Sequence, residues 1–469
     1  MPAPMRDFFQ RLVQTKLGLA GAMLTTASGF LIVLFFVLAM VGLEESPYLG
    51  ILAYLVLPAI FLIGLLLIPI GIWRERRRQR REGPSPLPVF DLNEPRTRSR
   101  VILFAALTAA NVLILAAAGW KGAEVMDRSE FCGSCHEVMD PEYTAYTRSP
   151  HARVACVQCH IGPGASWFVK SKLSGAWQVV SVTFDLYPRP IPTPVENLRP
   201  SRDTCEQCHW PTKFVGDRLR VLTRFAEDEK STPKKTVLLM HVGGGDAGHG
   251  IHWHVSPGVS IRYLADPKRE TVHTVEVTRP GGEVERYDLP PDEKAAPVDP
   301  SKLAWRTMDC VDCHNRPTHQ YRTATHEVDT ALAEGRIDRS LPFVRREAMA
   351  AITAKYADRA AAEAGIRDAL AGFYEKQHPE VWAAKRDQVL AAARVLAESW
   401  GYNVWPQMNI GWGTYPSLLG HEETTGCFRC HDETHATPSG KTISQDCETC
   451  HSMLADGEED PEILKKLYP

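Results

Sequence analysis

The chain has 469 residues, of which 23% are charged, and its formal net charge is −3. This length allows two or three ordinary domains. The nearly balanced charge gives no reason to expect nucleic-acid binding. The composition is uneven along the chain, because the first 120 residues are strongly apolar and the rest are polar.

Three N-terminal segments carry no charged residue and are long enough to cross a bilayer, which takes about 20 mainly apolar residues. They cover residues 17–43, 46–73 and 101–120. The first could instead be a cleaved signal peptide, but its apolar run is far longer than the roughly 7–15 residues of such a segment. We therefore expect three transmembrane helices.

Basic residues predict the orientation of these helices. An arginine-rich stretch, residues 74–81, follows the second segment, and three further arginines lie within 96–100, before the third segment. The link between the first two segments holds Glu44 and Glu45 instead. Because positive residues favour the cytoplasmic side, we expect the N-terminus inside and everything after residue 120 in the periplasm.

All 12 cysteines fall in six Cys-x-x-Cys-His pentads. Two thiols one helical turn apart followed by an imidazole are the attachment signature of c-type haem. Structural zinc sites also use Cys-x-x-Cys pairs, but they do not need a histidine directly after every pair. We therefore expect six covalently bound c-type haems. The attachment residues are Cys132, Cys135, Cys156, Cys159, Cys205, Cys208, Cys310, Cys313, Cys427, Cys430, Cys447 and Cys450, with the proximal histidines His136, His160, His209, His314, His431 and His451.

The remaining pattern predicts a mainly α protein: three transmembrane helices and a haem-packed extracytoplasmic cytochrome domain with a small β-rich insertion. Alternating apolar residues between Gly and Pro breaks indicate short strands, and Ala, Leu, Arg and Glu with helical spacing indicate the later helices. The expected parts are a membrane anchor (1–122), a domain for haems 1–3 (123–220), the insertion (221–300), the haem 4 segment (301–345), a helical spacer (346–400) and a C-terminal two-haem module (401–469).

Eleven of the 17 histidines lie outside the pentads, which is enough for two imidazoles on every iron. His319 is too close to the fourth pentad to ligate its own haem easily, so we expect it to serve a neighbour. His421 and His435 flank the fifth pentad and are candidates for the last two haems. His252 and His254 lie in a cluster open to three interpretations: haem ligands, a second metal site, or a hairpin edge with no ligand role.

The first two pentads, with Met139, the motif Ser149-Pro-His151 and a transmembrane segment just before them, resemble the opening of the NapC/NirT family of membrane-bound quinol dehydrogenases. The sequence from residue 307 onward resembles longer inner-membrane members from metal-respiring bacteria. The resemblance implies Met139 as a distal ligand of the first haem and His151 as another distal ligand. For Met139, ordinary packing is the alternative interpretation. It also implies a lysine at the quinol site, Lys172, with Lys170 in reserve, although Gln178 stands where an acidic residue is usual.

The resemblance favours a membrane-bound cytochrome that oxidises quinol, with menaquinol as the expected species, and passes electrons to an extracytoplasmic acceptor protein. One alternative is a non-catalytic electron-transfer subunit of a larger respiratory complex. Another is a multihaem reductase of nitrite or hydroxylamine, which would need an iron with an open distal position. The expected partners are therefore the lipid bilayer, a quinol and a protein, with no nucleic acid.

Overall fold

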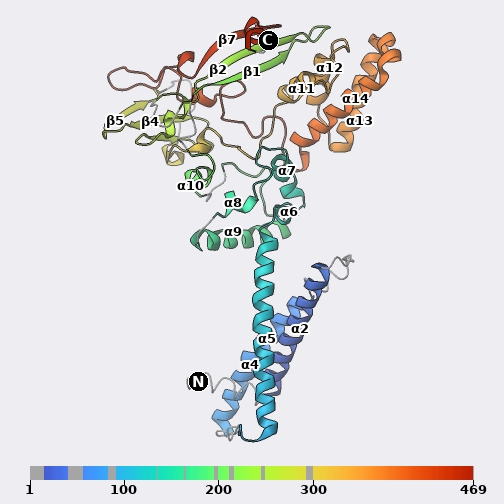
Figure 1. Cartoon of the computed structure of the whole chain (residues 1–469), viewed down its shortest axis with the longest axis vertical. Helices are drawn as coiled ribbons and strands as arrows, with labels where there is room; N and C mark the ends of the chain where they lie inside the picture. Colours follow the sequence, from blue (N-terminus) through green and yellow to red (C-terminus); the bar gives the residue numbers. More distant parts are fainter. Residues whose placement is uncertain are drawn as a thin grey trace. The chain divides into compact units, whose positions relative to one another are not determined.

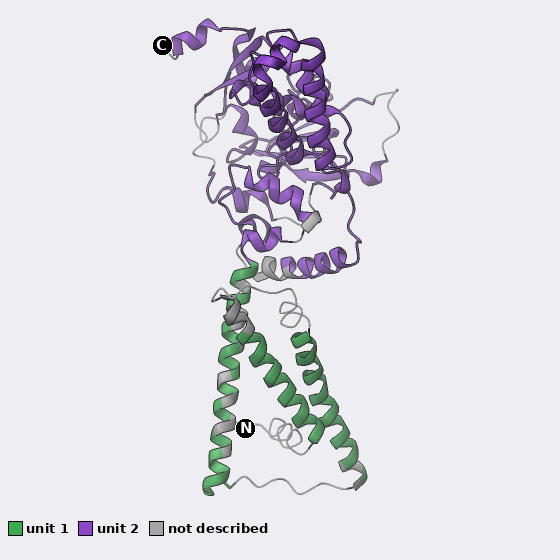
Figure 2. Cartoon of the chain, turned by 90° about the vertical axis from the view of Figure 1, so that its right-hand side faces the viewer, with its two compact units in different colours: residues 1–126 green, residues 127–469 purple. Residues whose placement is uncertain are grey.

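The computed structural model describes residues 15–40, 56–82, 91–134, 136–162, 165–194, 199–210, 216–243, 249–291 and 299–467, although some side chains inside the helices lie outside the description. The chain divides into two compact units, Met1–Met126 and Asp127–Pro469 (Figure 2).

The first unit contains three long helices (Figure 1): α2 (Lys16–Met40), α4 (Leu57–Glu82) and α5 (Pro95–Met126). Helices α2 and α4 pack closely through glycines. A Cβ atom at Gly64 would lie 2.7 Å from the backbone nitrogen of Thr25, and one at Gly21 would lie 2.8 Å from the carbonyl oxygen of Gly64. Small residues that let two backbones approach are typical of helix pairs in membranes.

Two helices in the described residues are long and apolar enough to cross a membrane, at residues 16–34 and 57–78. The sequence predicts three such spans, so the expectation is met for two. The third expected segment, residues 101–120, does form part of one continuous helix, α5, but it does not satisfy the same test, and several of its side chains lie outside the description.

The pentads of the second unit sit on short helical turns. The first three are carried by the helices α6 to α10, which include the longer α7 and α9. The last three sit on single 3-10 turns, η6, η8 and η9. Their bounds are α6 Ser129–Gly133, α7 His136–Thr147, α8 Cys156–His160, α9 Ala165–Thr183, α10 Ser201–Cys205, η6 Cys310–Asp312, η8 Gly426–Arg429 and η9 Cys447–Thr449.

Two antiparallel sheets follow (Figure 1). One has the order β1-β2-β7 and the other β5-β4-β3-β6. Their strands are β1 Arg218–Phe225, β2 Pro233–Met240, β3 Ser260–Ala265, β4 Val272–Thr278, β5 Val284–Asp288, β6 Ala304–Thr307 and β7 His451–Glu458. The predicted strands are present, but the stretch 221–300 is shared between the two sheets. The partner of β2 is β7, from the far end of the chain, with Met240 opposite His451.

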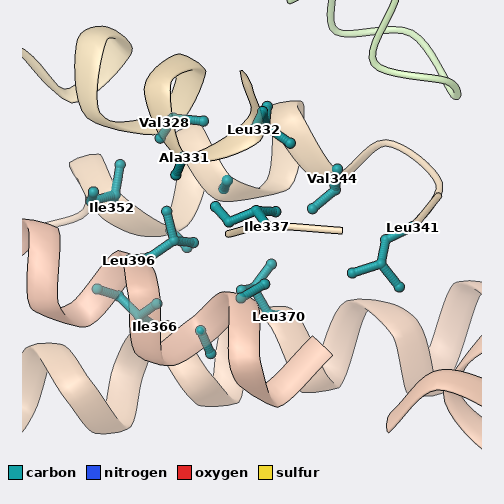
Figure 3. Close-up of a cluster of buried hydrophobic side chains, with 14 of the residues drawn as sticks. Val328, Ala331, Leu332, Ile337, Leu341, Val344, Ile352, Ile366, Leu370 and Leu396 are labelled. Atoms are coloured by element: carbon teal, nitrogen blue, oxygen red, sulfur yellow. The ribbon is translucent and has the colours of Figure 1, made fainter. Parts of the chain in front are cut away.

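Four helices form a layer with a conventional apolar core (Figure 3): α11 (Ala324–Ala333), α12 (Val344–Thr353), α13 (Arg359–Gln377) and α14 (Pro379–Asn403). Helical spacing predicts one apolar face on α14, and its members Val389, Ala393, Leu396 and Trp400 are buried. Leu390 and Val395, the other predicted members, are half-buried. The helical periodicity of the sequence therefore predicts this face correctly. Short elements complete the described chain: η4 Ile251–Val255, η5 Pro300–Lys302, η7 Pro406–Met408 and α15 Glu462–Leu467.

A buried carboxylate ties this helical layer to the pentad segments. Glu327 of α11 accepts hydrogen bonds from Ser399 and Asn403 of α14, at 3.1 and 3.3 Å. It also accepts one from Arg148, which follows α7, at 3.1 Å. Because a buried charge is costly unless it is paired, this contact restrains α7 against the helical layer.

Candidate functional site

The same backbone hydrogen bond closes three of the pentads. The amide of the pentad histidine donates to the carbonyl of the first cysteine in His209, His314 and His431, at 2.7, 2.8 and 3.1 Å. This bond completes one helical turn and brings the side chains at positions i and i+3 to one side. The local sequence thus presents two thiols and an imidazole together, as covalent attachment of a porphyrin requires.

Five of the six pentad histidines face a second imidazole that comes from outside the pentads. The ring centroids lie 5.7–6.5 Å apart. Two imidazoles that bind one metal ion at about 2 Å have centroids on the order of 6 Å apart. The pairs are His151 with His209, His160 with His319, His252 with His314, His254 with His431, and His421 with His451.

The pairing crosses between segments that are distant in sequence. His319 follows the fourth pentad but faces His160 of the second. His252 and His254 share the turn η4 yet face different pentads, the fourth and the fifth. The His249–His254 cluster therefore contributes one ring to each of two separate pairs.

Backbone carbonyls orient four of the five non-pentad rings. The Nδ1 atom of His319 lies 2.9 Å from the carbonyl oxygen of Glu142, and that of His254 lies 2.7 Å from Ile251. The corresponding distances are 3.3 Å for His151 and 3.2 Å for His252. A hydrogen bond at Nδ1 fixes the tautomer and leaves Nε2 as the ligating atom, which is the usual second shell of a metal-bound histidine.

The electrostatic environment of η4 also favours metal binding by His252 and His254. Burial lowers the pKa of His254, and the neighbouring rings of His431 and His252 lower it further, although its hydrogen bond to Ile251 opposes the shift. Burial also lowers the pKa of His252. Both effects favour the neutral imidazole, which is the form that binds a metal ion.

His435 and His241 have different hydrogen-bond partners from the five paired rings outside the pentads. His435 is buried, its Nδ1 lies 2.9 Å from an Asp432 oxygen, and its Nε2 lies 3.0 Å from the carbonyl oxygen of Val272. Both nitrogens of His435 thus contact oxygen atoms of the protein, and the ring is engaged in the fold instead of facing a pentad histidine, unlike the other candidates. His241 similarly contacts Asp217 and Ser452 through its two nitrogens.

Successive pentads are neighbours in space. Cys159 of the second interacts electrostatically with Cys208 of the third. Cys205 of the third hydrogen-bonds to Cys310 of the fourth. Cys427 of the fifth interacts electrostatically with Cys313 of the fourth and with Cys450 of the sixth, without a hydrogen bond.

The first and second pentads are also joined. The backbone amide of Cys156 donates to Ser129, just before the first pentad, at 3.3 Å. Tyr143 of α7 contacts both pentads: a Cβ atom at Gly133 of the first would lie 2.6 Å from its ring, and its hydroxyl interacts electrostatically with Cys156 of the second. The pentads therefore follow one another in space in the order of the chain.

The segments around the first three pentads have little protein core. Among the described residues from 127 to 217, the buried apolar side chains are Val138, Pro141, Ala145 and Tyr146. A porphyrin has a large apolar surface, so attached haems would supply the missing packing in these segments. Together with the thiols and the paired imidazoles, this composition fits c-type haem.

A charged cluster that sequence reasoning missed joins the fourth and fifth pentads. The buried Asp312 accepts hydrogen bonds from Tyr263 and Arg306, both at 2.6 Å, and from Arg269 at 3.2 Å. Arg429 of the fifth pentad donates to the carbonyl of Asp312 at 2.7 Å. The only sign of this cluster in the sequence is that charged residues, Asp312 and Arg429, stand between the two cysteines of the fourth and fifth pentads.

Comparisons with known proteins agree with this chemistry. Residues 94–188 match the model of the NapC/NirT cytochrome c family, N-terminal region. Over 455 residues the chain is 41% identical to the cytochrome c-type protein ImcH of Geobacter sulfurreducens, covering 95% of this chain and 89% of ImcH. It is 30% identical over 81 residues to the cytochrome c-type protein NrfH of Wolinella succinogenes, covering 17% of this chain and 45% of NrfH. No solved structure matches it.

The chain belongs to the NapC/NirT family of c-type cytochromes. As a NapC/NirT cytochrome it carries covalently attached c-type haem and transfers electrons in association with a membrane, to which its apolar N-terminal helices anchor it.

Two further residues implied by the NapC/NirT resemblance are only partly placed. Met139 lies on α7 and is half-buried, but Cys135 and the side chain of His136 lie outside the described residues. The distal side of the first pentad is therefore not defined. Lys172 lies on α9, and its side chain is also outside the description. Gln178, on the same helix, is exposed and donates to Ser174 at 3.4 Å.

Proposed function

We propose that this NapC/NirT cytochrome carries six haems, oxidises quinol at the outer face of the cytoplasmic membrane, and passes electrons to an extracytoplasmic acceptor protein. The observation that carries the proposal is the unbroken series of contacts from the first pentad to the sixth. Each haem iron would take up and release one electron at a time. A series of neighbouring centres between a membrane and a distant end is what an electron conduit needs.

In this proposal the protein's own residues hold and orient each centre. The paired thiols attach the porphyrins, and the five imidazole pairs provide both axial ligands of haems 2 to 6: His319 for haem 2, His151 for haem 3, His252 for haem 4, His254 for haem 5 and His421 for haem 6. Met139 is the proposed distal ligand of the first haem. His435 has a structural role.

The haem count and the ligands have a direct test. The mass of the intact mature protein should exceed that of the polypeptide by six haems. Replacing His151, His252, His254, His319 or His421 singly by alanine should convert one low-spin haem to high-spin, as measured by electron paramagnetic resonance. His435→Ala is the matched control, because it should leave every haem low-spin. A high-spin signal in this control alone would reverse the assignment.

Quinol oxidation is proposed at the first pentad. Quinols stay in the bilayer because they are apolar, and the first pentad follows the anchor directly in the chain. The test is to add a menaquinol analogue to the protein in nanodiscs and follow the haem α-band. We expect rapid reduction, which slows in Lys172→Ala but not in the control Lys355→Ala, an exposed lysine between α12 and α13. Reduction by dithionite without reduction by quinol would instead support the non-catalytic electron-transfer subunit.

A haem unit outside the membrane requires one more crossing after the arginine-rich stretch. We propose that α5 provides it, since α5 contains the charge-free residues 101–120 and leads into the first pentad. Reporter fusions should place residue 85 in the cytoplasm and the C-terminus in the periplasm. Both reporters on the same side would refute this topology.

A further inference from the structure

Helix α9, labelled in Figure 1, carries a stripe of exposed apolar side chains toward its C-terminal end. Leu173, Trp177 and Val180, together with Phe184 just after the helix, are 69, 63, 41 and 68% exposed. Their spacing of four, three and four residues places them on one helical face. Single exposed apolar residues are ordinary, but a contiguous patch of large ones marks a contact surface.

One flank of the stripe is polar and uncharged, while Val179 and Val182 add exposed apolar surface elsewhere on the helix. Ser174, Gln178 and Ser181 lie to one side of the stripe, and Ser181 is buried. No acidic or basic residue occurs from 173 to 184, whereas charged residues return at Asp185 and Arg189. The two lysines of α9, Lys170 and Lys172, precede this stretch. An uncharged apolar segment that carries a tryptophan suits the boundary between water and lipid acyl chains.

We propose that the α9 stripe, defined as Leu173, Trp177, Val180 and Phe184, lies in the outer interfacial layer of the membrane that holds the N-terminal anchor. The occupant is taken to be lipid because the same chain carries helices able to cross a bilayer, so a bilayer is always tethered nearby. The proposal rests on membrane anchoring of the haem unit and not on quinol oxidation.

The position of α9 in the chain gives this contact a consequence. Helix α8, which carries the second pentad, comes shortly before α9. Insertion of the stripe would therefore hold the second pentad, and with it the adjoining first pentad, at a fixed height above the bilayer. It would keep the proposed start of the electron path within reach of a molecule that does not leave the membrane.

Photolabelling tests the proposal in the full-length protein. The haem-loaded chain is placed in nanodiscs that contain a phospholipid with a diazirine near the headgroup, irradiated, and mapped by peptide mass spectrometry. We expect the peptide with residues 173–184 to be labelled at least fivefold more than peptides with Val221 or Val284, which are apolar and similarly exposed but lie on strands. Equal labelling of the three peptides would refute lipid contact.

A double variant, Trp177→Glu with Val180→Glu, should lose the labelling at α9, and Val284→Glu is the matched control. Unchanged haem absorbance and melting temperature would show that both variants fold. If lipid labelling is absent and an amine-reactive bifunctional cross-linker, added in a separate sample, joins the α9 lysines of two chains, the stripe belongs to a second copy and the proposal is overturned. Because labelling needs no electron transfer, its outcome is independent of whether quinol is oxidised.

Discussion

The carboxylate of Glu142 lies 3.1 Å from Nδ1 of His319. The carbonyl oxygen of Glu142 lies 2.9 Å from the same nitrogen. The ring proposed to ligate the second haem is thus held by a full negative charge as well as by a peptide dipole. A carboxylate behind a metal-bound histidine increases the basicity of that ligand.

This contact predicts the effect of Glu142→Gln. Removing the charge should raise the midpoint potential of one haem, because the oxidised iron loses the electrostatic stabilisation of the nearby carboxylate. A redox titration followed in the visible spectrum measures the shift. Glu363→Gln, which changes an exposed carboxylate on α13 in the helical layer, is the control and should leave all potentials unchanged. A titration curve identical to that of the wild type would contradict the proposed role of His319.

The two rings of η4 are predicted to act on different haems. His252→Met and His254→Met should each alter the spectrum and potential of one haem, and the double variant should show the sum of both changes. The reason is that His252 faces His314 whereas His254 faces His431. Magnetic circular dichroism in the near infrared distinguishes methionine from histidine ligation. If the double variant altered only one haem, the two rings would not serve separate centres.

Asp312 is predicted to stabilise the junction of the fourth and fifth pentads. Asp312→Asn should lower the free energy of unfolding by about 3 kcal/mol, because Arg306 and Arg269 would lose a buried charge partner. Tyr263→Phe removes one hydrogen bond to the same carboxylate and should cost about 1 kcal/mol. Denaturation in guanidinium chloride compares the two. Equal losses would mean that the charge contributes nothing beyond a single hydrogen bond.

The helical layer should be stable without haem, whereas the pentad segments should not. If haem attachment is prevented, residues 324–403 should keep slow amide exchange because their core consists of protein side chains. Residues 127–210 should exchange rapidly because few apolar side chains are buried there. Hydrogen–deuterium exchange with mass spectrometry follows both regions. Equal loss of protection would show that the layer depends on the haems.

Within that layer, Leu370→Ala should cost about 2–5 kcal/mol of unfolding free energy, since it opens a cavity in a close-packed core. The haem spectrum should stay unchanged. Glu363→Ala on the same helix is the control and should change stability by less than about 0.5 kcal/mol, because Glu363 is exposed. A changed haem spectrum in Leu370→Ala would contradict the expectation that the core of the layer does not shape the haem environments.

Stability in acid should depend on Asp288. Hydrogen bonds from Arg286 and Thr274 lower the pKa of Asp288 in the folded protein. A carboxyl whose folded pKa is below its unfolded value, about 3.9, stabilises the fold above that pH and loses this contribution as the pH falls below it. Thermal melting from pH 6 to pH 2.5 should therefore show a wild-type advantage over Asp288→Asn that shrinks below about pH 4. An advantage independent of pH would indicate that hydrogen bonding alone is responsible.

Much of this protein could be read from the sequence, because the signals are local. A pentad such as Cys310–His314 needs only one turn of chain to bring its donors together, and the apolar positions of α14 need only helical periodicity. The charge-free segments of the anchor are equally local, since the length and polarity of a helix decide whether it can cross a bilayer.

The pairing of imidazoles was decided by tertiary structure alone. His319 lies five residues after His314 but faces His160, and His435 looks like a ligand in sequence but is bonded at both nitrogens. Likewise, β2 finds its partner β7 at the other end of the chain. Which imidazole pairs with which pentad depends on how segments far apart in the sequence pack together. The spacing of residues along the chain does not determine the distances between such segments.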